Sequence, residues 1–181
     1  MDMSEREQPL FREPDETLER PDAWSEPKGF LIGGWGNWPR RDLAQQYYDA
    51  ATVLVEAIKS GDWEDYRLAN PVLYLYRHFL ELMLKDVLRD QSSEHNIDGL
   101  TERLEVFVYE RHGLRLPPWM VERLHKLAEI DPGSTAFRYA EVRDKESKEF
   151  VPVPGEFHAN LHQLQSVMKA LRQILIRLDD A

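Results

Sequence analysis

The fold class is decided by residues 70–89, which read Asn70-Pro-Val-Leu-Tyr-Leu-Tyr-Arg-His-Phe-Leu-Glu-Leu-Met-Leu-Lys-Asp-Val-Leu-Arg89. Asn70 is a favourable N-cap and Pro71 suits the first helical position, so the sequence predicts a helix that begins here. At about 100° per residue, apolar side chains cover most of the helix and the remaining side chains share one narrow stripe. The helix is therefore expected to be buried on most sides. The stripe consists of Tyr74, Arg77, His78, Glu81, Lys85 and Arg89.

Two interpretations of this polar stripe are open. It is a solvated face, on which Arg77, Glu81, Lys85 and Arg89 form successive i,i+4 pairs worth roughly 0.2–0.5 kcal/mol each. Alternatively, it lines a cleft or a subunit seam and places His78 among cations and one carboxylate, which is a typical setting for a functional site.

Four further helices are predicted outward from this stretch. The first covers about residues 39–60, with Gly61 as a left-handed cap. Others cover roughly residues 98–111, ending at Gly113, and a segment from Pro117-Pro118 to just before Asp131. Residues 135–142 and 148–153 flank a charged turn and are expected to pair as a hairpin. The predicted fold is an all-α bundle of about five helices with a small β-hairpin between the fourth and last helix.

The last predicted helix, about residues 156–178, has apolar residues spaced alternately by four and three. This is a heptad seam, which is typical of helix pairing. It serves either an intramolecular bundle or a two-fold dimer, and we favour a homodimer. The seam consists of Phe157, Leu161, Leu164, Met168, Leu171, Leu175 and Leu178.

Composition limits the class of protein. Residues 1–28 are rich in charge and proline and are expected to form a disordered acidic arm, followed by one helical-bundle domain over residues 29–181. The net charge of -10 disfavours broad DNA binding. Absence of cysteine excludes disulfides and thiolate metal sites. No export signal or membrane span is recognisable, so we expect a cytoplasmic protein without a cofactor.

A family resemblance rests on three strings between residues 70 and 140. They are Tyr76-Arg77-His78-Phe79-Leu80-Glu81-Leu82-Met83-Leu84-Lys85, His95-Asn96-Ile97-Asp98-Gly99-Leu100 and Phe137-Arg138-Tyr139. Together they resemble small bacterial proteins with HEPN-like helical bundles. That family is helical and usually dimeric, occurs in toxin–antitoxin and phage-defence systems, and includes many RNases that need no metal.

The resemblance also implies a catalytic site. The family signature is an arginine, often followed by a polar residue, with a histidine four to six positions later, and Arg89-Asp90-Gln91-Ser92-Ser93-Glu94-His95 matches it. By analogy His95 is the general acid/base for the ribose 2′-hydroxyl and Arg89 stabilises phosphate charge. The stripe residues Arg77, His78 and Glu81 are expected nearby, with RNA or an antitoxin as partner.

Two other functions remain open. The chain is alternatively a non-catalytic helical dimerisation or interaction module whose polar stripe is structural. A third possibility is a metal-binding bundle, because His158 and His162 are spaced i,i+4 and could share one helical face. Surface or packing roles for these two histidines are preferred. The segment Asp131-Pro-Gly-Ser-Thr135 is interpreted as an ordinary turn.

Overall fold

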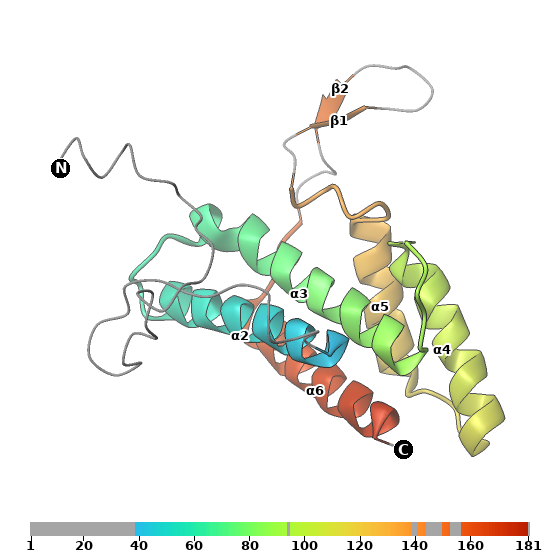
Figure 1. The fold of residues 1–181 in the computed structure, drawn as a ribbon. Helices are drawn as coiled ribbons and strands as arrows, with labels where there is room; N and C mark the ends of the chain where they lie inside the picture. The colour runs from blue at the N-terminus through green and yellow to red at the C-terminus, as the bar shows by residue number, and fades with distance from the viewer. Residues whose placement is uncertain (1–38, 94, 139–140, 144–149, 153–156, 181) are drawn as a thin grey trace, which may run out of the picture. The chain divides into compact units, whose positions relative to one another are not determined.

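The computed structural model describes residues 39–93, 95–138, 141–143, 150–152 and 157–180. This part contains five α-helices, which confirms the predicted all-helical architecture (Figure 1). The proposed arm at residues 1–28 lies outside the described residues, and the division into 1–28 and 29–181 stays a prediction. None of the described helices is long and apolar enough to cross a membrane.

Helix α2 (Arg40–Lys59) matches its predicted span closely. Its buried face is small, with Ala44, Ala51 and Val55 fully enclosed, so α2 packs closely against α3. The helix ends as expected, because Gly61 adopts a positive φ of 82°. Only glycine reaches this backbone region without a steric penalty.

Helix α3 (Asp65–Val87) begins six residues earlier than predicted. Its N-cap is Glu64 rather than Asn70, and Pro71 lies inside the helix. A proline at that position forgoes one backbone hydrogen bond. The additional turn is stabilised by tertiary packing, because Leu68 contacts the hydrophobic core. Core packing therefore extends the helix past a local start signal.

Helices α4 (Ile97–His112) and α5 (Pro118–Ile130) agree with the sequence prediction within one residue at each end. The Asn96 side chain accepts a hydrogen bond from the Asp98 amide at the start of α4, and Gly113 ends the helix with a φ of 64°. Pro118 occupies the first helical position of α5. These ends are set by local capping chemistry, which sequence alone reveals.

Two three-residue strands, β1 (Glu141–Arg143) and β2 (Phe150–Pro152), pair antiparallel with Val142 opposite Val151. The residues that join them lie outside the described part of the chain, so the complete hairpin stays a prediction.

Helix α6 (Leu161–Asp179) begins later than predicted. The Asn160 side chain caps it by accepting a hydrogen bond from the Gln163 amide. Phe157, the first residue of the proposed seam, precedes the helix and is 48% exposed. A specific N-cap thus starts the helix at Leu161, although the apolar pattern in the sequence extends back to Phe157.

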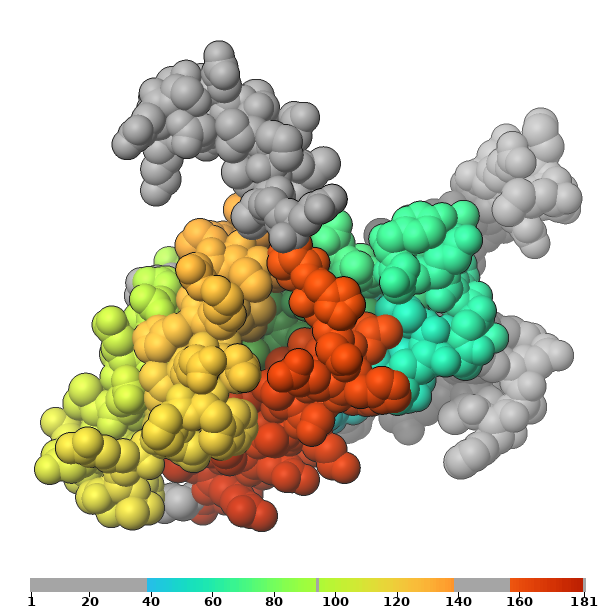
Figure 2. All heavy atoms as spheres, turned by 180° about the vertical axis from the view of Figure 1, so that it is seen from behind, coloured from blue at the N-terminus to red at the C-terminus, as the bar shows by residue number. Residues whose placement is uncertain are grey.

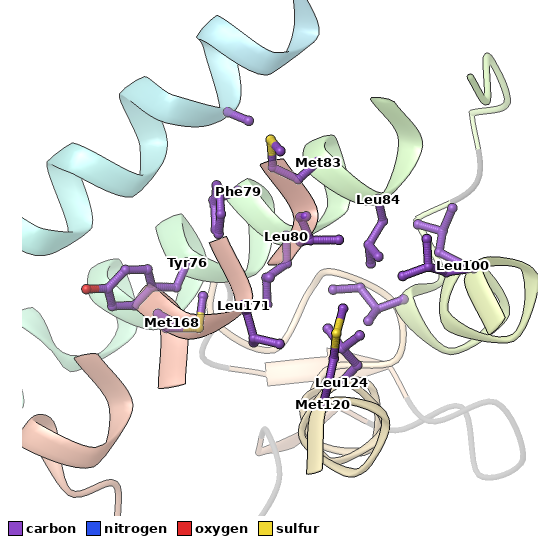
Figure 3. Packing of buried hydrophobic residues seen from close by; sticks show 14 of the residues in the cluster. Tyr76, Phe79, Leu80, Met83, Leu84, Leu100, Met120, Leu124, Met168 and Leu171 are labelled. Carbon is purple, nitrogen blue, oxygen red and sulfur yellow. The ribbon is translucent and has the colours of Figure 1, made fainter. Parts of the chain in front are cut away.

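The hydrophobic core involves all five helices (Figure 3). Helix α3 packs on α2, α4 and α6, whereas α4 packs on α5. The α6 seam is part of this core, since Met168, Leu171 and Leu175 are at most 3% exposed. Helix α6 lies on the face shown in Figure 2. The centre of its seam, formed by these three residues, is covered by the same chain, in which α6 packs on α3 and α2. The seam therefore gives no reason of its own to expect a dimer, and the homodimer stays a prediction.

Candidate functional site

The centre of the polar stripe on α3 is buried. Arg77, Glu81 and Lys85 are 0%, 1% and 6% exposed, respectively. The interpretation of the stripe as a solvated face is therefore wrong for these three residues. Buried ions require partners at short range, because leaving water costs several kcal/mol per ion.

Arg77 is fully paired by groups from three parts of the chain. Its Nη1 lies 3.0 Å from Glu81 Oε2, and its Nη2 donates to the His95 backbone carbonyl at 2.7 Å. Its Nε lies 2.9 Å from Asp131 Oδ2. The Asp131 carbonyl accepts from the same guanidinium at 3.3 Å. The planar guanidinium thus ties α3 to the segment before α4 and to the loop after α5.

Glu81 links this arginine to two more polar groups. Its Oε1 accepts from Lys85 Nζ at 3.1 Å and lies 2.7 Å from His95 Nδ1. Burial by itself would raise the pKa of Glu81. Hydrogen bonds from His95 and Lys85, together with the charge of Lys85, outweigh burial and lower the pKa below its usual value. Glu81 is therefore an ionised acceptor at neutral pH.

Arg77, Glu81, Lys85 and His95 form one polar cluster. His95 is its exposed member, with a side chain that is 59% accessible. An ionised carboxylate only accepts hydrogen bonds, so Glu81 fixes the neutral tautomer with the proton on Nδ1. The other ring nitrogen, Nε2, then carries a lone pair. Because the His95 carbonyl is also held by Arg77, both its backbone and its ring are positioned. Such an imidazole is suited to general acid/base chemistry on a ligand from solvent.

Asp131 belongs to the cluster although the sequence indicated only a turn. Its Oδ1 accepts from the backbone amides of Thr135 and Ala136, at 2.8 and 2.9 Å. Its Oδ2 faces Arg77 without a well-aligned hydrogen bond. The side chain therefore orders the turn and compensates the buried arginine. Its sequence position, 54 residues from Arg77, gives no indication of this pairing.

His78 occupies a different environment on the same stripe. Its ring is in edge contact with Tyr47 of α2 at 4.4 Å between centroids and stacks on Tyr74 at 5.8 Å. Burial lowers the pKa of His78, and nearby Glu81 only partly opposes this. His78 is thus a neutral member of an aromatic cluster rather than of the ion network.

Arg89 lies just beyond the end of α3, with a positive φ of 52°. Its side chain is 71% exposed and pairs with Asp179 of α6 at 3.0 Å. Among the described residues, no hydrogen bond or ion pair joins Arg89 to His95. The structure thus brings together Arg77, Glu81 and His95, and it directs Arg89 to a different carboxylate.

The two histidines considered for metal binding do not share a helix. His158 precedes α6, whereas His162 lies in its first turn. The predicted i,i+4 helical spacing is therefore wrong, because Asn160 starts the helix between them. In the part of the chain that the structure describes, no three histidine, aspartate or glutamate side chains come together as a metal site.

A second imidazole–carboxylate pair joins α4 and α5. His125 Nδ1 of α5 makes a short contact with Asp98 Oδ1 of α4. The two side chains are 40% and 49% exposed. They line an open groove of about 760 Å³ between these helices. Its wall also includes Asn96, Glu122, Lys126, Ala128, Glu129 and Pro132.

Comparison with known proteins found no matching family model, no matching curated protein and no matching solved structure.

Proposed function

We propose that this chain is a HEPN-like protein of bacterial toxin or defence type and acts in the cytoplasm as a metal-independent RNA endonuclease. The observation that supports this best is the 2.7 Å contact between Glu81 Oε1 and His95 Nδ1. It combines a buried, ionised orienting group with an accessible imidazole, which is the arrangement that proton transfer requires.

In this proposal His95 Nε2 accepts the proton of a ribose 2′-hydroxyl, whose oxygen then attacks the adjacent phosphorus. The 5′-oxygen leaves and is protonated, giving a 2′,3′-cyclic phosphate and a 5′-hydroxyl. Arg77 and Glu81 act as positioning residues, because both are buried and hold His95 at its carbonyl and its ring. Arg89 is exposed and meets the phosphate from solvent.

The test is cleavage of single-stranded RNA in excess EDTA. We expect activity to persist, and His95→Gln and Arg89→Ala each to lower the rate by about 10²-fold or more, as is usual when an acid/base or charge contact is lost. The matched control is His162→Gln, an exposed histidine on α6, which should retain full activity. If the folded protein cuts no RNA, or cuts equally well after both substitutions, the nuclease proposal fails.

A non-catalytic dimerisation or interaction module is the second candidate, because α4 presents apolar side chains to solvent. Val106 and Tyr109 are 56% and 61% exposed, and Leu114 beyond the helix is 63% exposed. In this proposal, these exposed apolar side chains are covered by another protein, such as a second copy or an antitoxin. Light scattering at tens of micromolar tests the homodimer, and a monomer would contradict it.

A further inference from the structure

Metal-independent cleavage of RNA requires two proton transfers at one phosphate. One group removes the 2′-hydroxyl proton, and another protonates the departing 5′-oxygen. The 2′-oxygen forms a bond to the phosphorus from which the 5′-oxygen departs, so both groups must face the same phosphate. His95 supplies one of them in the proposed function, and the second remains to be found.

The pair of His125 and Asp98 repeats the chemistry of the pair of His95 and Glu81. In both, a carboxylate holds Nδ1 of an imidazole, and a carboxylate can only accept the proton there. In both, Nε2 is the ring nitrogen left for a ligand. Both imidazoles are accessible, with side chains that are 59% and 40% exposed.

Each pair includes a residue at or just before the start of α4. His95 lies two residues before the first residue of that helix, and Asp98 is its second residue. Three Cα–Cα steps of 3.8 Å limit the separation of these two Cα atoms to about 11 Å. The groove that contains His125 is walled by Asn96, the residue that follows His95. A helix N-terminus at this point additionally favours an anionic ligand.

The acidic residues of the groove do not leave it strongly negative. Glu122 pairs with Arg123 at 3.0 Å, and Glu129 pairs with Lys126 at 2.7 Å. Asp98 is engaged by His125 itself. Glu122 and Glu129 thus each have a cationic partner, which lessens the negative charge that a phosphate meets, and the Asp98 charge is compensated when His125 is protonated.

The geometry points to His125 as the second acid/base residue of the same site, a conclusion that rests on the proposed function. One imidazole takes the 2′-hydroxyl proton as the 2′-oxygen forms its bond to phosphorus. The other, as imidazolium, gives a proton to the 5′-oxygen as that bond breaks. Each histidine returns to its starting state by exchanging one proton with water, so the step needs no metal and no further reactant.

The experiment compares two substrates. One is a dinucleotide, and the other is a uridine 3′-aryl phosphate, whose nitrophenolate leaves without being protonated. His125→Gln should lower dinucleotide cleavage by about 10²-fold or more, as His95→Gln does, with His162→Gln as the unaffected control. With the aryl ester, whichever histidine donates the proton loses its importance, so one of the two variants should recover nearly wild-type rate.

The outcomes separate this inference from the nuclease proposal. If His95→Gln abolishes cleavage while folded His125→Gln cuts normally, His125 is not part of the site and the nuclease proposal stands. If the wild-type protein cuts no RNA, cytidine 3′-monophosphate titrated into it tests the shared site by NMR. Both imidazole resonances should then shift with one dissociation constant, and a shift of only one, or of neither, overturns the inference.

Discussion

Helix α3 is buried on two faces that are stabilised in different ways. The apolar face, which includes Tyr76, Phe79 and Met83, packs into the core shared with α2 and α6. The charged face, formed by Arg77, Glu81 and Lys85, is equally enclosed but contacts polar groups before α4 and after α5. One face is stabilised by contact area, the other by matched charges.

The two faces should therefore differ in how much stability a substitution costs. Dispersion and hydrophobic contacts are numerous and individually weak, so an apolar face tolerates a residue of similar volume. A buried ion network depends on every partner, since loss of one leaves the others charged and desolvated. The charged face is also the one that positions His95. Stability and the candidate site are therefore linked on this side of α3 only.

The largest effect is expected from Arg77→Ala, which leaves Glu81 and Asp131 with one fewer compensating charge. We expect a loss of about 3–5 kcal/mol in the free energy of unfolding, measured by urea denaturation. Arg89→Ala is the matched control, because this arginine is exposed and should cost no more than about 1 kcal/mol. Equal losses for the two arginines would show that the buried charges have access to water.

The second largest effect is expected from acid, which should lower the free energy of unfolding by protonating the charged face. The pKa of Glu81 is lowered in the folded protein by its partners, despite burial. A group of this kind contributes stability in full above its unfolded pKa of about 4.3 and loses that contribution as pH falls through the folded value. The wild type should therefore lose stability below about pH 4 more steeply than Glu81→Gln. Parallel pH curves for the two proteins would contradict the prediction.

A volume-conserving substitution on the apolar face should lower the free energy of unfolding less than a substitution in the ion network does. Leu84 is fully buried, and Leu84→Met keeps the side-chain volume, so we expect a loss below about 1.5 kcal/mol. Urea denaturation with an unchanged m-value is the check. Glu81→Gln, which is also nearly isosteric, provides the comparison at neutral pH, and it should cost more. If Leu84→Met lowers the free energy of unfolding as much as Glu81→Gln does, the two faces are equally sensitive to a volume-conserving substitution.

Sequence patterns predicted where the faces lie but not what covers them. The helical wheel places Arg77, Glu81 and Lys85 on one stripe, as the structure has them. Their burial depends on Asp131 and His95, which are 54 and 18 residues away from Arg77. Such pairings arise from the packing of α4 and α5 on the rest of the bundle. The periodicity of apolar residues along α3 does not predict these pairings.

Helix ends show the same division between local and tertiary causes. Gly61, Gly113 and Pro118 mark helix ends through their own backbone preferences, and these ends were predicted correctly. The starts of α3 and α6 were misplaced. Leu68 extends α3 through core packing, and the Asn160 cap shortens α6 within a continuous apolar pattern. Where a local capping signal and a tertiary contact favour different helix starts, the start depends on contacts that form only in the folded chain.

The smallest effect is expected at the exposed end of the charged stripe, where Arg89 has a left-handed backbone conformation with a φ of 52°. Both Arg89→Ala and Arg89→Gly remove the pair between the exposed Arg89 and the largely buried Asp179. Because Asp179 keeps Arg41 as a second partner, this loss should cost about 1 kcal/mol or less. Alanine pays a steric cost in this region that glycine avoids, so the glycine variant should be more stable than the alanine variant by about 0.5–1 kcal/mol.

Thermal or urea denaturation of the two Arg89 variants measures this difference, and RNA cleavage gives a second reading of the same proteins. If Arg89 contacts phosphate as proposed, both variants should lose activity equally, since both lack the guanidinium. An activity loss that follows the stability difference instead would assign Arg89 to helix termination and the Asp179 pair. In that case, the only functional part of the stripe would be its buried centre, which orients His95.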